Sequence, residues 1–418
     1  MNEAKAPARR FLIVYAQDSL WSMGEGIGAG AFSRTPRALA RAGHEVHMVL
    51  PAPRGGAPGV EEFDGIRLHR YATAFRFHPR LGPLPIRLAS RVQTYLAYQR
   101  IGTRTTRAAA ERVEPDLILA YGTFEAPVAR RVALRIGVPN VTRLFGNSLS
   151  LTLDDPVRFR LNFPEVWAFR TPCARLILTN DGANGQEVAR RCGVPPDRFI
   201  HLRNGLDFSA FTPGPASGAV RDRLSVPADA PLLMTVTRLA PEKKLERLVD
   251  AMPSLLERVP NACAVLIGEG PERPALEERI RRLGVAHAVR LPGAIPNHEL
   301  PDWYRTAAVV LSLLDRTNAS NPVFEAMACE RCVIALDAGT TDEVVVDGET
   351  GVLLGRDDLP RLGSILAELL GDPGRREALG RAARSHVRGL LLDPEDRMRQ
   401  EIGILLDVIE EAKRKERV

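Results

Sequence analysis

The stretch AVVLSLLDRTNASNPVFEAMACERCVIALD, residues 308–337, contains the pattern that decides the fold. It begins and ends with short apolar runs, 308–314 and 332–337, in which apolar and polar residues do not alternate. Such runs are typical of strands buried on both faces, as in a parallel sheet covered by helices. Because a polar loop and a helical pattern lie between them, we predict one strand–helix–strand unit here.

The same alternation runs along the whole chain. Further strand-length apolar runs are separated by amphipathic segments of helical spacing, such as TPRALARAGH at 35–44. The pattern predicts an α/β protein built from doubly wound, Rossmann-like sheets. The other clear runs lie at residues 11–15, 45–50, 116–121, 175–179, 231–239 and 263–270.

The chain is expected to form two domains. Residues 211–230 are rich in Pro, Gly and Ala and have no strand pattern, so they predict a linker. We expect an N-terminal Rossmann-like domain over 1–210, a second domain over 231–390, and a C-terminal helix over 391–418 that can pack back on the first domain. Doubly wound sheets bind ligands at the C-terminal ends of their strands, so a cleft between the domains is the expected site.

Composition describes an ordinary globular protein. The chain has 418 residues, of which 45% are apolar and 26% charged, and its net charge of +6 favours anionic ligands without implying nucleic acid. No apolar run approaches the roughly 18 residues that span a bilayer. The first run is about six residues long and too short for a secretory signal, so we expect a cytoplasmic location.

The cysteines and histidines do not predict a metal site. Five cysteines are scattered through the chain, as is typical of reduced thiols. Cys329 and Cys332 have CxxC spacing, but no second pair exists to complete a zinc site. The histidines show no metal-ligand spacing either, so we expect no metal.

The loop after residue 314 predicts an anion site. Asn321 is a good N-cap and Pro322 suits the first helical position. The backbone N–H groups of Val323 and Phe324 would then point out of a positive helix end, with Glu325 one turn further in. A helix N-terminus of this kind binds anions. A carboxylate beside it would repel an anion, so Glu325 is expected to have a separate function.

Two further motifs suit a phosphate ligand. A strand ends at Arg238 and a helix begins at Lys243 and Lys244, so fixed cations could neutralise a diphosphate, although a solvated helix start is the alternative. Glycines also lie between strands and helices, where they let backbone N–H groups approach a ligand, although a flexible lid or a tight connection would need them too. These glycines are Gly24, Gly26, Gly28, Gly30 and Gly268.

The order of the motifs carries a family resemblance. TRLAPEKK, IGEGPERPALEE and FEAMACERCVIALDAGTTDEVVVDGETGVLL follow one another in the second half, and GIGAGAFSRTPRALARAGHEVHMVL and RNGLDFSAFTPG lie in the first. Together they resemble the GT-B glycosyltransferases of the family 4 type over nearly the whole chain. The resemblance implies an acceptor-side domain and a nucleotide-sugar donor domain that face each other across a cleft.

The resemblance also implies a ligand and roles. The donor would be a nucleoside-diphosphate sugar, linked to UDP or GDP, with Arg238 and Lys243 on the diphosphate and Glu325 accepting from the ribose hydroxyls. The backbone of residues 321–323 would meet the distal phosphate, and that of Ile295 the base. Family members generally transfer sugar with retention, and no cofactor or catalytic metal is implied.

The chain departs from the family on the sugar side. Eight positions before Glu325, where the family has a first glutamate, stands Thr317, and three substrate-binding candidates follow it: Asn318, Ser320 and Asn321. In the first domain the family often has histidines where this chain has Tyr121 and Phe145. The remaining sugar-side candidates there are Tyr121, Thr123 and Glu125. Either the donor sugar is not plain glucose or mannose, or the sugar site has decayed.

Residues 65–110 contain nine arginines and no acidic residue, with aromatic residues interleaved. This composition suits an anionic membrane surface or an anionic, lipid-linked acceptor, and a solvated arginine-rich helix is the alternative. RNA binding is disfavoured because no recognised module accompanies the charge. The interleaved aromatic residues are Tyr71, Phe75, Phe77, Tyr95 and Tyr98.

The sequence therefore predicts a glycosyltransferase that moves a sugar to a hydroxyl acceptor, which could be a glycan, a lipid-linked molecule or a small molecule. Two alternatives stay open. One is a catalytically silent subunit that binds nucleotide or glycan, and the other is a nucleotide-sugar epimerase.

Overall fold

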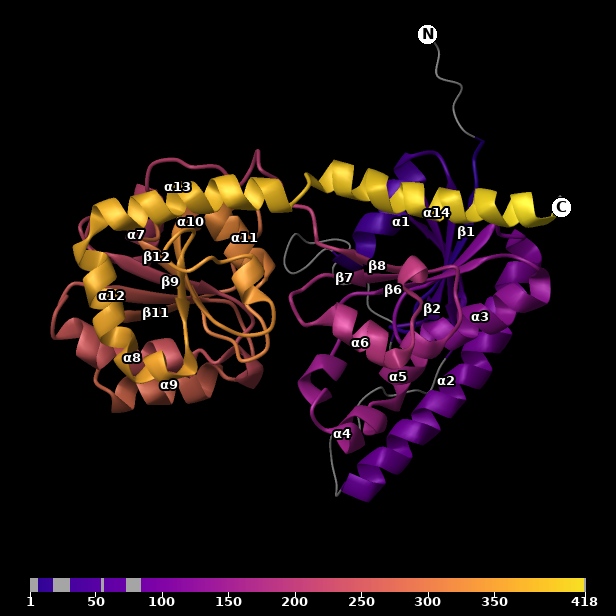
Figure 1. Ribbon diagram of the computed structural model, residues 1–418, viewed down its shortest axis with the longest axis horizontal. Coiled ribbons are helices and arrows are strands. Elements are labelled where there is room, and N and C mark those ends of the chain that lie inside the picture. The colour runs from indigo at the N-terminus through magenta and orange to yellow at the C-terminus, as the bar shows by residue number, and fades with distance from the viewer. Residues whose placement is uncertain (1–6, 18–30, 54–55, 73–83, 417–418) are drawn as a thin grey trace, which may run out of the picture.

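The computed structural model describes residues 7–17, 31–53, 56–72 and 84–416. Two largely parallel sheets lie side by side, each with helices on both of its faces (Figure 1). The predicted α/β class with two doubly wound, Rossmann-like units is confirmed. Within the described residues, none of the helices combines the length and the apolar character that crossing a bilayer requires.

The first sheet is parallel except for one edge strand. Its described strands lie in the order β3 (Gly59–Phe63), β4 (Ile66–Tyr71), β2 (Glu45–Pro51), β1 (Arg10–Val14), β5 (Leu117–Ala120), β6 (Asn140–Leu144), β7 (Arg175–Thr179) and β8 (Phe199–Leu202). The antiparallel strand is β3, which lies at one edge of this sheet and pairs with β4. Its helices are α1 (Ala31–Arg41), α2 (Leu84–Val113), α3 (Glu125–Ile136), α4 (Pro156–Leu161), α5 (Phe163–Arg170) and α6 (Gly185–Cys192).

The second sheet is parallel throughout its described strands. Their order is β11 (Val289–Gly293), β10 (Cys263–Ile267), β9 (Leu232–Val236), β12 (Val309–Ser312), β13 (Cys332–Leu336) and β14 (Val352–Leu354). The opening stretch therefore forms β12, a helix and β13, which is the predicted strand–helix–strand unit. Its helices are α7 (Gly218–Leu224), α8 (Glu246–Leu256), α9 (Arg273–Arg282), α10 (Leu300–Thr306), α11 (Asn321–Ala328), α12 (Leu362–Gly371) and α13 (Pro373–Leu390).

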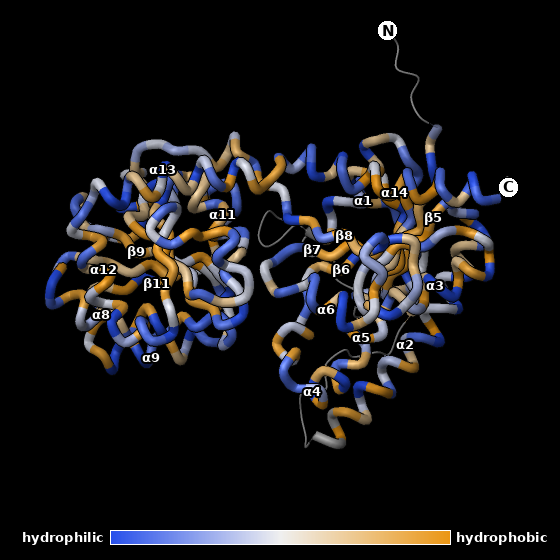
Figure 2. Tube along the Cα trace, in the orientation of Figure 1, coloured by the Kyte–Doolittle hydropathy of each residue, from blue (hydrophilic) through white to orange (hydrophobic). Residues whose placement is uncertain are grey.

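The strands are buried on both faces, as their unbroken apolar runs predict. In β1, Leu12 and Val14 belong to one hydrophobic core, whereas Phe11 and Ile13 belong to the core on the opposite face of the sheet. Figure 2 shows the apolar strands inside each unit and the more polar helices around them. Burying each such side chain contributes roughly 1.5–3 kcal/mol, so the two-sided cores are the main support of both sheets.

Two segments connect the units. Residues 211–230, expected as a plain linker, contain α7, whose Val220 and Leu224 lie in a core of the second unit because they recur at helical spacing. The last helix, α14 (Pro394–Glu416), follows α13 and runs along the first unit beside α1 (Figure 1).

The basic stretch 65–110 differs from the expectation. Tyr71, Tyr95 and Tyr98 are buried core residues with 7%, 2% and 0% of their surface exposed, so they do not form an interfacial aromatic surface. The reason is that Tyr71 ends strand β4, while Tyr95 and Tyr98 lie on the inner side of α2. Phe75 and Phe77 lie outside the described residues.

Candidate functional site

The two units meet where the C-terminal ends of their strands face each other. After β12, Arg316 donates from Nη1 to the carbonyl of Asn147 (2.8 Å) and Thr317 donates from Oγ1 to the carbonyl of Asp181 (2.9 Å). After β13, the backbone N–H of Thr340 donates to the carbonyl of Gly182 (2.9 Å). These loops follow the strands of both sheets, so the predicted cleft region is where the units touch.

Three cationic side chains lie together at this edge of the second sheet. Burial lowers the pKa of Lys243, and the nearby Arg316 and Arg238 lower it further. Arg238 is exposed and pairs with Glu242 at 2.5 Å, so it is free to turn toward a stronger anion. The sequence analysis did not predict Arg316. It stands next to Thr317, the position where this chain lacks the family glutamate, and that neighbouring arginine could have indicated an anion-binding residue. Clustered cations that repel one another favour a polyanionic ligand.

Glu325 lies in the first turns of α11, with its carboxylate held by one neighbour. Tyr304 of α10 is fully buried and donates from its hydroxyl to Oε2 of Glu325 (2.8 Å). Burial raises the pKa of Glu325 to about 7, although Tyr304 and the guanidinium of Arg34 oppose this shift. A carboxylate with one oxygen bound by a phenol keeps acceptor capacity for ligand hydroxyls.

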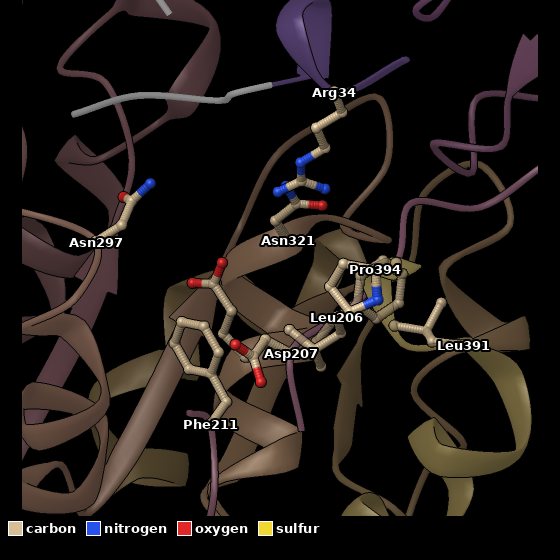
Figure 3. A pocket seen from close by; sticks show the side chains of 11 residues that line it. Arg34, Leu206, Asp207, Phe211, Asn297, Asn321, Leu391 and Pro394 are labelled. Atoms are coloured by element: carbon tan, nitrogen blue, oxygen red, sulfur yellow. The ribbon is translucent and has the colours of Figure 1, made fainter. Parts of the chain in front are cut away.

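Glu325 lines a cavity of about 140 Å³ at the junction of the two units (Figure 3). Arg34 reaches it from α1, Asn321 and Asn297 come from the second unit, and Asp207 comes from the connection between the units. The other lining residues are Gly205, Leu206, Phe211, Phe324, Leu391 and Pro394. A guanidinium, two carboxylates and two amides lie around this small cavity, so it suits a polar ligand with hydroxyl donors near the carboxylates and acceptor oxygens near the guanidinium.

The start of α11 differs from the prediction by one residue. Ser320, not Asn321, is the N-cap, and its carbonyl accepts from the N–H groups of Val323 (3.0 Å) and Phe324 (3.1 Å). The two N–H groups that were expected to face an anion therefore already donate to the carbonyl of Ser320, because the helix begins one residue earlier than predicted. Pro322 is at the second helical position, and the side chain of Asn321 accepts from Asn204 at 3.4 Å.

Two of the expected sugar-side residues hold the loop together. Asn318 is fully buried and bonds through its side chain to Ser312, Leu314 and Leu336, so no valence remains for a ligand. Thr317 is 5% exposed and packs in the contact between the two units, which we call the seam. A Cβ added at Gly182 would lie 2.4 Å from Thr317 Oγ1, so the seam has no room for a glutamate at 317 in this arrangement.

The donor-side glycine and isoleucine also have structural roles. A Cβ at Gly268 would lie 2.0 Å from the carbonyl oxygen of Thr237, and φ is +138° there, so only glycine lets the ends of β9 and β10 come this close. Ile295 follows β11 and buries its side chain in a core of the second unit. Its backbone lies at the same edge of the sheet as the three cations.

The first-unit candidates lie away from the cavity. Tyr121 is 1% exposed and packs edge-on against Phe145, with ring centroids 4.7 Å apart, so these two positions form an aromatic core pair. Glu125 accepts from the N–H of Ala16 (2.7 Å), and burial raises its pKa to about 8. Thr123 is half-buried in the turn before α3. Gly26, Gly28 and Gly30 lie outside the described residues.

Comparison with known families matches both units. Residues 35–210 match the family described as Glycosyltransferase Family 4, and residues 218–386 match the family described as Glycosyl transferases group 1. The two matches meet at the connection between the units.

Individual relatives agree with this match. The chain is 30% identical over 289 residues to the GDP-mannose-dependent alpha-(1-6)-phosphatidylinositol monomannoside mannosyltransferase of Mycolicibacterium smegmatis, covering 62% of this chain and 75% of that protein. It is 33% identical over 222 residues to the D-inositol 3-phosphate glycosyltransferase of Kribbella flavida, covering 51% of this chain and 52% of that protein. The chain thus spans about half the length of several of the curated relatives it matches.

Solved structures show the same architecture. Sucrose-phosphate synthase of Thermosynechococcus elongatus superposes with a TM-score of 0.74 at 19% identity, covering 96% of this chain and 99% of that one. HepE of Anabaena, solved with UDP and glucose, superposes with a TM-score of 0.68 at 18% identity, with the same coverage of both chains. At these identities the likeness concerns the fold alone.

Proposed function

The chain belongs to the GT-B glycosyltransferases of the family 4 type, and we propose that it transfers a sugar from a nucleoside-diphosphate sugar to a hydroxyl acceptor. The observation that carries this proposal is that cations and a carboxylate share one edge of the second sheet: Arg238 and Lys243 follow β9, and Arg316 and Glu325 follow the neighbouring β12. The cations suit a diphosphate, and the carboxylate suits the ribose hydroxyls next to it. A ligand with both groups would explain why the carboxylate of Glu325 lies near an anion site.

The proposed reaction places charge where these residues lie. The bond between the anomeric carbon and the diphosphate oxygen breaks, and the acceptor oxygen forms a new bond to that carbon. The acceptor proton passes to the departing phosphate oxygen, so no separate metal or cofactor is needed for balance. Lys243 and Arg316 stabilise the negative charge as it grows on the diphosphate. We propose a donor linked to UDP or GDP, and transfer with retention.

The relatives suggest the first acceptors to test. The names of the mycobacterial and Kribbella proteins both contain an inositol that bears a phosphate. We therefore propose inositol phosphates and phosphatidylinositol glycans as the first acceptor class for this chain. A neutral glycan that is glycosylated faster than either would contradict the acceptor proposal but leave the donor proposal standing.

Nucleotide binding should single out one base and should depend on pH. We expect one member of a panel of UDP, GDP, ADP and their sugar conjugates to raise the melting temperature, because ligands of the native state stabilise it. Affinity should rise as the pH increases through about 7, since the carboxyl of Glu325 must lose its proton to accept two hydroxyl hydrogen bonds. Glu325→Gln should weaken binding about tenfold at pH 8 and flatten this profile.

The matched control is Glu330→Gln, five residues further along and not among the residues that line the cavity. It should keep both the affinity and the pH profile. If no nucleotide shifted the melting temperature of the wild type, a silent GT-B subunit would be the better description.

We also propose that the exposed face of α2 contacts anionic lipid. Leu96, Arg100, Arg104 and Arg107 are exposed and recur at intervals of three or four residues, so they share one face of the helix. Ile86, near the start of α2, is 61% exposed. Apolar and cationic side chains on one face suit the headgroup region of a bilayer.

Vesicle binding tests this contact. Arg100→Glu with Arg104→Glu should weaken binding to vesicles of one part phosphatidylglycerol to three parts phosphatidylcholine by about 30-fold, since each cation contributes about 1 kcal/mol. Arg135→Glu with Arg198→Glu changes the net charge equally at other exposed positions of the first unit. Equal loss in both double variants, or no binding by the wild type, would reject the lipid contact.

A further inference from the structure

Arg34 connects the two units at the cavity. It belongs to α1 of the first unit, yet it lines the same cavity as Asn321 and Glu325 of the second (Figure 3). In Figure 3 its guanidinium points toward Asn321. The next residue, Thr35, donates to Glu401 of α14 (2.8 Å), which fixes this end of α1.

The charge of Arg34 is poorly balanced by the protein. Burial lowers its pKa, the carboxylate of Glu325 opposes that shift, and the guanidinium of Arg397 adds to it. Nearby arginines are paired: Arg37 binds Asp64 at 2.6 Å and Arg397 binds Glu401 at 2.7 Å. For Arg34, the described part of the chain provides no such ion pair.

The cavity therefore suits a ligand with two kinds of polar group. The ligand must have acceptor oxygens next to Arg34, because a guanidinium has five N–H donors and no acceptor. It must have hydroxyl donors next to Glu325. A ribose that carries a phosphate has both groups a few bonds apart, and guanidinium forms paired hydrogen bonds to phosphate.

We propose that Arg34 binds a phosphate oxygen of the donor nucleotide whose ribose is held by Glu325, so that the first unit contributes directly to donor affinity. This inference rests on the proposed function, because it assigns a further contact at the same nucleotide site. Its consequence is that the donor site is complete only while Arg34 of α1 and Glu325 of α11 line the same cavity.

Calorimetric titration of the full chain tests this assignment, using the nucleoside diphosphate that gives the largest melting shift. Arg34→Met should weaken binding of that diphosphate about tenfold or more, the effect of losing a charged hydrogen bond. Binding of the corresponding nucleoside, which has no phosphate, should change much less. Arg34→Lys should recover part of the loss, since the ammonium keeps the charge without the planar fork.

Arg37→Met is the matched control, because Arg37 is on the same helix but pairs with Asp64 instead of facing the cavity. It should bind the diphosphate as the wild type does. A fall in affinity for diphosphate and nucleoside by the same factor would overturn the assignment, because it would show that Arg34 only supports the cavity.

Unchanged or tighter diphosphate binding by Arg34→Met would also overturn it. If Glu325→Gln and Lys243→Met still lost affinity, the proposed function would stand without Arg34. If all three variants bound like the wild type, the nucleotide site itself would be misplaced. Melting curves of each variant show whether the fold is intact, and the diphosphate-to-nucleoside ratio stays informative in a destabilised variant.

Discussion

Replacing Lys243 with methionine is expected to weaken nucleoside-diphosphate binding by about 10- to 100-fold and to lower kcat by about 10²–10³-fold. Methionine keeps most of the length of the side chain but removes its charge. Burial and the nearby Arg316 lower the pKa of Lys243, so its ammonium is held in an unfavourable place until an anion binds. A bound diphosphate relieves that repulsion. The ammonium stabilises the diphosphate most strongly when the sugar bond breaks and the leaving group gains negative charge.

The neighbouring Lys244 provides the control. Its ammonium lies 3.7 Å from Glu246, and its φ of 54° is a value that asparagine tolerates. Lys244→Asn should therefore keep nucleotide affinity and kcat. Calorimetric titration and a donor-hydrolysis or transfer assay measure both quantities. Equal affinity in wild type and Lys243→Met would place the diphosphate elsewhere, and equal losses in the two variants would point to a general charge effect.

The fold could be predicted from the sequence because its strands are buried on both faces. The runs that become β1, β9, β12 and β13 are apolar without alternation, and a series of short runs of this kind is typical of parallel strands covered by helices. The apolar runs did not mark β3, β4, β6, β8 or β14. These strands are short or contain polar residues, and the five residues of the edge strand β3 are all exposed.

Single-residue roles in the site were harder to predict than the place of the site. Arg238, Lys243 and Glu325 lie at the predicted strand ends. Asn318 resembled a ligand-binding loop residue, but it is fully buried and bonds to the backbone of its own loop. Its partners include Leu336, which is 18 positions away and reaches Asn318 only through the packing of β13 beside β12.

The same limit applies to contacts between distant parts of the chain. Arg34 and Glu325 are 291 positions apart in the sequence, as the difference of their numbers gives, and they line one cavity only because the two units meet there. Thr317 was compared with a family glutamate, whereas its side chain bonds to the carbonyl of Asp181 in the other unit. No local pattern reports a contact of this kind.

The largest loss of stability is expected from Glu401→Gln, in the buried charge cluster that joins α14 to the first unit. Glu401 is 1% exposed and lies 3.3 Å from Arg143 and 2.7 Å from Arg397. Removing its charge leaves two buried guanidinium groups without a counter-ion, which should cost about 3–5 kcal/mol. Differential scanning calorimetry should show an earlier first transition, and hydrogen exchange should show faster exchange of the α14 amides. Glu411→Gln, which removes a half-buried partner of Arg175 on the same helix, should cost only about 0–1 kcal/mol.

The pH dependence of this stability separates charge from packing. Burial alone would raise the pKa of Glu401, but Arg143 and Arg397 together hold it below the ordinary value. Its contribution is therefore complete above about pH 4.3, the value of an unfolded glutamate, and is lost as the pH falls through the lower folded value. Glu401→Gln should lack that acid-side loss while being less stable at pH 7. If the two proteins lost stability in parallel toward low pH, Glu401 would hold α14 by packing and not by its charge.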